Sequence, residues 1–153
     1  VGPHPYRVAG PGPVDDWTVE LDASSYIDST ADRLDSTEIL AVDGTRFDFR
    51  GGARVGDLRL DRAYTDVAAD ADGLARLIVT GPDGRGVRMT WDPVTCPWVQ
   101  TFTTDFPDLP QHRSAFAAEP MSCPPNAFVN GIDVVSLEPG DTHRAEWTIA
   151  PVG

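Results

Sequence analysis

Apolar side chains recur at every second position in several short stretches of the chain. Residues 17–21 read Trp-Thr-Val-Glu-Leu, and residues 98–102 read Trp-Val-Gln-Thr-Phe. A period of two is the spacing of a β-strand that buries one of its faces. Residues 77–79 and 87–91 alternate in the same way on either side of Gly-Pro-Asp-Gly at 81–84, which is typical of a β-hairpin. Shorter alternating runs occur at 58–60 and 145–149.

Turn-forming residues separate these runs. The spacing of the turns favours an all-β sandwich or barrel. No segment of ten or more residues has the i, i+3, i+4, i+7 apolar stripe of an amphipathic helix, and only residues 28–40 could hold a single helical turn. The turn clusters lie at 10–13, 43–44, 51–52, 70–73, 130–131 and 139–140.

The composition is typical of a globular protein with little helix. The chain has 153 residues, of which 41% are hydrophobic and 24% are charged. This length allows a substantial core within a single domain spanning 1–153. Aspartate, glycine and proline together make up nearly a third of the residues, and all three disfavour helices.

The net charge excludes one class of partner. The chain carries 24 acidic and 12 basic residues, for a formal charge of −12. Such a field repels phosphate backbones, so no nucleic acid is expected as a partner. The apolar runs are too short to span a membrane, and no charged and then apolar leader opens the chain. We therefore expect no membrane association and a cytoplasmic protein.

One candidate for proton transfer lies near the start of the chain. His4 stands between two prolines, which restrict the backbone and present the imidazole. Imidazole titrates near neutrality and can accept or donate a proton. Composition alone favours a plainer interpretation, in which His4 is a surface residue of a loosely held terminus.

Two carboxylates are further candidates. Glu119 stands in an apolar neighbourhood, and partial burial would raise its pKa and suit it to general base catalysis. A glutamate paired with an arginine or pointing to solvent is the alternative. Asp61 follows an alternating run and could accept hydrogen bonds from sugar hydroxyls, although an ordinary aspartate at a strand end fits the same pattern.

Five segments, taken together, resemble motifs of one family. They read Gly-Pro-His-Pro-Tyr at 2–6, Leu-Asp-Arg-Ala-Tyr at 60–64, Pro-Trp-Val-Gln-Thr-Phe-Thr at 97–103, Ala-Glu-Pro-Met at 118–121 with Pro-Asn-Ala-Phe at 125–128, and Leu-Glu-Pro-Gly-Asp at 137–141 with Trp-Thr-Ile at 147–149. In this order they resemble the aldose 1-epimerase (galactose mutarotase) family in its actinobacterial form. The resemblance implies an antiparallel β-sandwich, the C-terminal portion of the family's supersandwich.

The resemblance also implies four site residues. His4 matches the general acid and Glu119 the general base, while Asp61 and Gln100 match residues that bind sugar hydroxyls. The implied reaction interconverts the α and β anomers of a free aldohexose, such as galactose or glucose, by opening and closing the ring. Two proton-transferring groups suffice, so neither a metal nor another cofactor is expected.

The chain departs from the family in its length. Members are about twice as long, and their N-terminal half contributes further residues to the sugar site. The resemblance therefore implies an incomplete site here. We expect the chain to associate with the missing N-terminal half or with a second copy of itself.

The two cysteines allow a check on strand register. If Gln100 lies opposite Glu119 in an antiparallel pair, the same register sets Cys96 opposite Cys123. Pro97 and Pro120 could introduce a bulge and disturb this register. We expect two neighbouring free thiols and no disulfide.

Two other functions fit parts of the pattern. A hexose-6-phosphate epimerase of the same superfamily would need a cationic phosphate pocket, for which Arg7, Arg62 and Arg113 are candidates. A carbohydrate-binding β-sandwich without catalysis would share the fold, because one fold can serve both roles.

Overall fold

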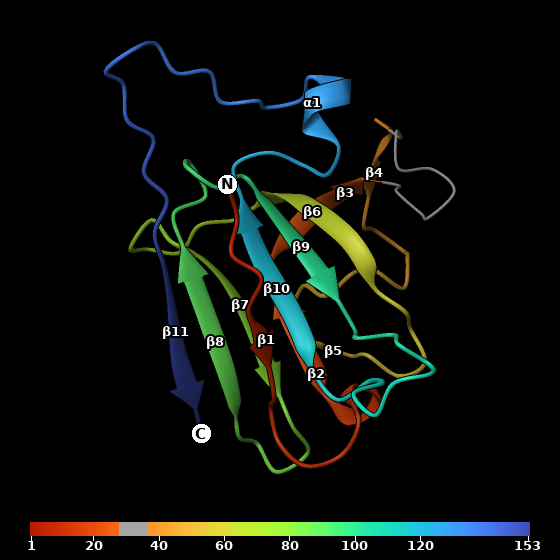
Figure 1. Ribbon diagram of the computed structural model, residues 1–153. Coiled ribbons are helices and arrows are strands. Elements are labelled where there is room, and N and C mark those ends of the chain that lie inside the picture. Colours follow the sequence, from red (N-terminus) through yellow and green to blue (C-terminus); the bar gives the residue numbers. More distant parts are fainter. Residues whose placement is uncertain (28–36) are drawn as a thin grey trace.

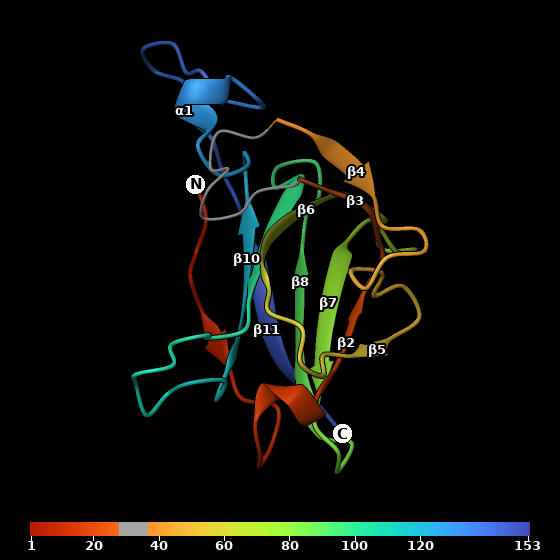
Figure 2. The ribbon, with the colours of Figure 1, turned by 90° about the vertical axis from the view of Figure 1, so that its right-hand side faces the viewer.

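Two antiparallel β-sheets pack against each other in the computed structural model of the chain (Figure 1). The structure describes residues 1–27 and 37–153. A side view separates β1 and β10 of one sheet from β7, β2 and β5 of the other (Figure 2). This arrangement confirms the predicted antiparallel β-sandwich.

The first sheet has six strands in the order β1-β10-β9-β6-β3-β4. Each neighbouring pair is antiparallel. The strand β9 matches the alternating run at 98–102 that the sequence predicts. The bounds are Tyr6–Arg7 for β1, Ala23–Ile27 for β3, Ile39–Ala41 for β4, Asp61–Val67 for β6, Trp98–Phe102 for β9 and Phe116–Met121 for β10.

The second sheet has five strands in the order β11-β8-β7-β2-β5. The hairpin predicted around residues 81–84 joins β7 to β8, and its turn closes with a bond from Gly84 N to the Gly81 carbonyl at 3.0 Å. Gly84 has a φ of +78°, which glycine adopts without strain. The bounds are Thr18–Leu21 for β2, Ala53–Arg54 for β5, Ala75–Thr80 for β7, Gly86–Trp91 for β8 and Trp147–Val152 for β11.

Helix is confined to two short elements among the described residues. These are the 3-10 helix η1 (Val14–Asp16) and the helix α1 (Ala127–Asn130). Neither is long and apolar enough to cross a membrane. Of the stretch 28–40 suggested as a helical turn, residues 28–36 lie outside the described residues, and its C-terminal end enters β4.

One predicted strand is absent. The alternating run at 58–60 is not paired in a ladder, and β6 begins only at Asp61. Much of the backbone there bonds to side chains, since the Leu58 carbonyl accepts from Arg113 and the Leu60 amide donates to Thr103 Oγ1 at 2.9 Å. The Leu60 carbonyl also accepts from Thr103 N at 3.1 Å, a single contact outside any ladder. The two leucines are buried nonetheless, which explains why the run has the pattern of a strand.

The core lies between the two sheets. Alternation places Val19, Leu77 and Met89 on the inner face of the five-stranded sheet, each fully buried. Val99 and Phe116 point into the same cluster from the six-stranded sheet. Burying a side chain of this size stabilises the fold by about 1.5–3 kcal/mol. The alternate residues, among them Gln100 of β9 and Glu119 of β10, consequently point to the outer face.

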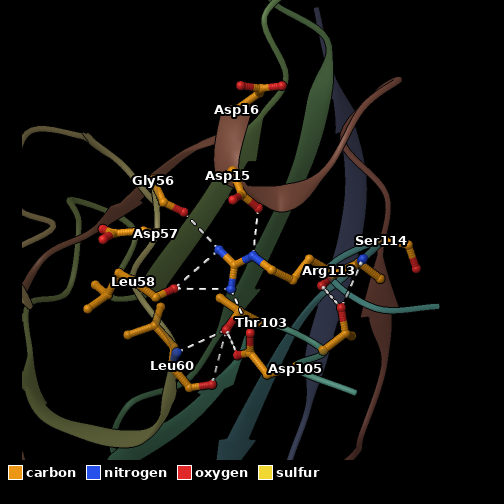
Figure 3. Close-up of polar contacts among 12 residues, drawn as sticks. Asp15, Asp16, Gly56, Asp57, Leu58, Leu60, Thr103, Asp105, Arg113 and Ser114 are labelled. Carbon is orange, nitrogen blue, oxygen red and sulfur yellow. Dashed lines mark hydrogen bonds and ion pairs between the residues drawn. The ribbon is translucent and has the colours of Figure 1, made fainter. Parts of the chain in front are cut away.

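A buried arginine ties the loops together at one end of the sandwich (Figure 3). Arg113 Nε donates to Asp15 Oδ1 at 2.6 Å, and Nη1 donates to Asp105 Oδ1 at 2.7 Å. The guanidinium also donates to the carbonyls of Gly56 and Leu58. One side chain therefore links η1, the segment before β6 and the connection between β9 and β10, and we call this network the Arg113 clamp.

The connection that carries Arg113 has two strained backbone positions. Thr104 and Arg113 have φ values of +52° and +51°, in the left-handed region that residues with a Cβ rarely adopt. Arg113 N donates to the Thr104 carbonyl at 2.9 Å, and Thr104 Oγ1 donates to the Ala115 carbonyl at 2.9 Å. These bonds fix how β9 returns into β10.

Replacing Arg113 with methionine should destabilise the protein by roughly 3–5 kcal/mol, because Asp105 and two carbonyls lose a buried partner. Urea unfolding measures the change. Arg85→Met, at an arginine in an exposed hairpin, is the control and should change the free energy of unfolding by less than about 0.5 kcal/mol. An unfolding midpoint for Arg113→Met equal to that of the control would contradict this role.

Candidate active site

The register of β9 and β10 places two of the predicted residues side by side. Glu119 pairs with Gln100, within an unbroken ladder from Ala117 opposite Phe102 to Met121 opposite Trp98. This is the register considered in the check on the two cysteines, and the ladder continues through Pro120 without a bulge. Because opposed residues point to the same face, both polar side chains lie on the outer face of the six-stranded sheet.

The N-terminal segment brings His4 to the same place. Ser122 N donates to the Val1 carbonyl at 3.0 Å, and Tyr6 pairs with Ala117, so the segment runs beside β10. Gly2 allows the close approach, since a Cβ there would lie 2.9 Å from Cγ of Met121. His4 therefore lies between two points of attachment that flank Glu119.

An imidazole and a carboxylate meet on this face. His4 Nε2 lies 3.1 Å from Glu119 Oε1. The imidazole is 55% exposed, whereas the carboxylate is only 11% exposed. The contact joins two residues that are 115 positions apart in the chain. It places the accessible imidazole of His4 beside the shielded carboxylate of Glu119, and both groups can accept or donate a proton.

Asp61 and Gln100 form a second polar pair beside the first. Gln100 Nε2 donates to Asp61 Oδ1 at 2.6 Å, which fixes the orientation of the amide. Gln100 Oε1 is buried and accepts no hydrogen bond from the described residues. The structure thus brings the four predicted site residues together on β10, β9, β6 and the segment that precedes β1.

The environment of Glu119 changes its acidity. Burial raises its pKa above the ordinary value, and the negative charge of Asp61 raises it further. The charges of His4 and Arg7 act in the opposite direction and do not cancel the increase. The direction agrees with the apolar neighbourhood seen in the sequence.

Aromatic side chains line the same face. The His4 and Tyr6 rings lie 4.9 Å apart, and Phe102 packs edge-on against Phe106 at 5.2 Å. Trp98 is only 1% exposed, and its Nε1 donates to Asp133 Oδ2 at 2.7 Å. Trp98 therefore packs in a small outer cluster with Ile27, Ala63, Met121 and Ile132.

A groove adjoins the site at Tyr6. Its volume is about 360 Å³. Its walls come from the loop between β9 and β10, which the sequence patterns did not single out. The lining residues are Tyr6, Thr104, Phe106, Leu109, Gln111, Ser114 and Ala115.

The three candidate arginines do not form one pocket. Arg113 belongs to the clamp, and Arg7 is 3% exposed on the core side of the sheet. Arg62 stacks over the Phe47 ring at 4.1 Å. Within the described residues, no group of three or more histidine, cysteine, aspartate or glutamate side chains is arranged to hold a metal ion.

Both cysteines are free, as expected. Cys96 is buried in the main core, and burial raises the pKa of its thiol. The ladder between β9 and β10 ends at Met121 opposite Trp98, before the cysteines. The proximity of the two thiols stays a prediction.

Comparison with known proteins gives one family and one fold. A family model described as aldose 1-epimerase matches residues 1–150. The uncharacterized protein YihR of Escherichia coli K12 is 29% identical over 150 residues, which cover 97% of this chain and 45% of YihR.

Two solved structures have a similar fold. A GalM/aldose epimerase homologue from C. elegans matches with a TM-score of 0.74 and 22% identity, over 97% of this chain and 49% of that one. A putative aldose 1-epimerase from E. coli K12 matches with a TM-score of 0.64 and 23% identity, over 99% and 47%. The chain spans about half the length of these relatives.

Glu119→Gln should stabilise the fold at neutral pH. A raised carboxyl pKa means that ionisation costs more in the folded chain than in the unfolded one, so stability is lost as pH rises through the folded pKa. Glutamine resembles the protonated acid, so its advantage should vanish below the ordinary glutamate pKa of about 4.3. Urea unfolding at several pH values, with exposed Glu138→Gln as control, measures this. A uniform loss of stability at every pH would contradict it.

Proposed function

The chain belongs to the aldose 1-epimerase family, and from this premise we propose that it interconverts the α and β anomers of a free aldohexose. The observation that carries the proposal is the contact between His4 and Glu119, 3.1 Å apart on the outer face of the six-stranded sheet. Galactose or glucose is the class of substrate that we propose.

The proposed reaction needs two proton transfers on one hemiacetal. Glu119 accepts the proton of the anomeric O1 hydroxyl, while His4 donates a proton to the ring oxygen O5. The C1–O5 bond breaks, O1 becomes the aldehyde oxygen, and C1 turns about the C1–C2 bond. Ring closure on the other face of the carbonyl reverses both transfers and restores the two side chains.

The different exposure of the two groups suits these roles. A base works best when its pKa lies near the working pH, and the raised pKa of Glu119 moves it in that direction. His4 is half-exposed, so a sugar can reach the imidazole from solvent. The carboxylate beneath is shielded from bulk water, which strengthens its interaction with a bound hydroxyl.

Asp61 and Gln100 are the proposed hydroxyl-binding residues. Asp61 is exposed and its carboxylate can accept from a sugar hydroxyl. Gln100 Oε1 has acceptor capacity that the described residues do not use, while its amide nitrogen is held by Asp61. Together they would orient the ring against the acid–base pair.

An uncharged sugar fits this face better than a sugar phosphate. The clamp engages Arg113 with two carboxylates, and Arg7 lies on the core side. A phosphate would also meet the negative charges of Asp61 and Glu119. A sugar-binding module without catalysis is the other candidate, since Asp61 and Gln100 alone would serve binding.

We also propose that the β11 side of the sandwich is covered by more protein. The strand β11 is an edge strand, and Trp147 and Ile149 are 39% and 47% exposed. Exposed apolar edges favour pairing with another chain. The part of the family fold that this chain does not span, or a second copy, would cover them. A cytoplasmic location belongs to the same proposal and is supported by the two free thiols.

Glu119→Gln should slow anomer exchange by roughly 10²–10⁴-fold, because glutamine cannot accept the O1 proton. NMR exchange spectroscopy of glucose or galactose measures the rate, and line broadening of the sugar signals measures binding. Glu138→Gln should leave both unchanged. Binding without acceleration by the wild-type chain would support the sugar-binding alternative, and wild-type exchange by Glu119→Gln would contradict the proposed base.

Sedimentation should show self-association that grows with protein concentration when the chain is studied alone, because β11 offers an apolar edge. Trp147→Lys should weaken it by introducing a charge at that edge. Val94→Lys, at an 87% exposed valine in a loop, should not. A monomer at every concentration would contradict the proposed association of copies.

A further inference from the structure

Arg7 is a buried cation directly behind the acid–base pair. Alternation along β1 turns Tyr6 to the outer face and Arg7 to the core, where the arginine is 3% exposed. Arginine is almost never so deeply buried without a paired carboxylate. No salt bridge of Arg7 with a carboxylate occurs among the described residues, so its burial needs another explanation.

The Arg7 guanidinium bonds to backbone carbonyls next to both His4 and Glu119. Arg7 Nη2 donates to the Ala118 carbonyl at 3.0 Å, and this carbonyl belongs to the peptide bond that leads into Glu119. Nη1 donates to the carbonyl of Pro5, the residue after His4, at 3.4 Å. Nη2 also contacts Sδ of Met89 in the opposite sheet. The same side chain thus joins the segment of the imidazole to the strand of the carboxylate.

The charge of Arg7 acts on Glu119 as well. Burial lowers the pKa of Arg7 to about 10, so it remains a cation at neutral pH, and the charge of Glu119 favours that state. Glu119 is influenced by His4 from the segment before β1, by Arg7 from β1 and by Asp61 from β6. Gln100 of β9 is uncharged. Arg7 is the member of this set whose positive charge does not change during the proposed proton transfers.

We propose that Arg7 is a positioning residue for the acid–base pair, whose planar guanidinium bridges the carbonyls of Pro5 and Ala118 and whose charge acts on Glu119 from the core side. This inference rests on the proposed function. An apolar side chain would fill the same space at a lower desolvation cost. The arginine instead gives the two catalytic segments a common rigid support, because its donors are fixed in one plane.

Two substitutions of Arg7 distinguish the effect of its hydrogen bonds to the two carbonyls from the effect of its positive charge. Arg7→Met removes both, and its thioether suits the apolar surroundings next to Met89. Arg7→Lys keeps the charge but lacks the planar fork that reaches two carbonyls. Arg88→Met, at an exposed arginine of β8, is the matched control. Circular dichroism and urea unfolding establish that each variant is folded.

The first measurement is the pKa of Glu119, which does not require that the chain catalyses a reaction. NMR titration of the ¹³C-labelled Glu119 side chain in the full chain should show a higher apparent pKa in Arg7→Met than in the wild type, because a positive charge has been removed. Arg7→Lys and Arg88→Met should titrate like the wild type. An unchanged Glu119 titration in folded Arg7→Met would overturn the action of the charge, whether or not the chain is an epimerase.

The second readout is anomer exchange of the preferred aldohexose. Arg7→Lys should lower kcat by about 10–100-fold with little change in KM, since a small misplacement of the reacting groups is costly. Arg7→Met should lower kcat at least as much and shift the Glu119 limb of the pH profile to higher pH. If Arg7→Lys keeps the wild-type kcat, the bridging role is wrong. This test with Arg7→Lys can be made even if Arg7→Met does not fold. A shifted Glu119 titration in a chain without any exchange activity would refute the proposed function alone.

Discussion

The pairing of β9 with β10 is the constraint on which the site depends. Side chains alternate between the faces of a strand, so a slip of one residue would turn Glu119 into the core and Ala118 outward. The inner face resists such a slip because Phe116, Ala118 and Val99 are fully buried there. In the connection between the two strands, Thr104 and Arg113 have left-handed conformations, and the bond from Arg113 N to the Thr104 carbonyl ties them together beside the Arg113 clamp. Core packing and the clamp therefore act together to set Glu119 opposite Gln100.

Buried charge affects stability differently in the Arg113 clamp and at Glu119. In the clamp, Asp15 and Asp105 neutralise Arg113, and although burial works against it, the hydrogen bond and charge of Arg113 lower the pKa of Asp15 overall. That contribution to stability is present above the ordinary aspartate pKa and is lost as pH falls. At the site, burial raises the pKa of Glu119, so its ionisation opposes folding as pH rises. The clamp supports the fold, whereas the ionisation of Glu119 costs stability, a cost that is common at functional sites.

The sequence predicts those parts of the fold that local patterns determine. The β7–β8 hairpin follows from Gly-Pro-Asp-Gly between alternating runs. The pairing of Gln100 with Glu119 was a possible register that the strand patterns allowed but did not determine. The strand predicted at 58–60 was wrong. Its leucines are buried as in a strand, but its backbone bonds to the side chains of Arg113 and Thr103. The Arg113 clamp joins residues up to 98 positions apart, and no local period encodes such contacts. The meeting of His4 with Glu119 was expected from family resemblance alone, since residues of one strand pattern say nothing about a segment 115 positions away.

The two outer faces of the sandwich explain why the polar residues on one of them are candidates for chemistry. On the five-stranded sheet the outer face carries Glu20, Arg76 and Arg88, which are exposed and solvated in the ordinary way. On the six-stranded sheet, Ala63 and Ala117 lie on the same face as Gln100 and Glu119, and both alanines are fully buried. Ala63 packs there with Ile27 and Trp98 in the outer cluster, so apolar side chains cover the sheet beside Gln100. Gln100 and Glu119 therefore stand among packed apolar side chains on this face, whereas the charged residues of the other outer face are exposed to solvent.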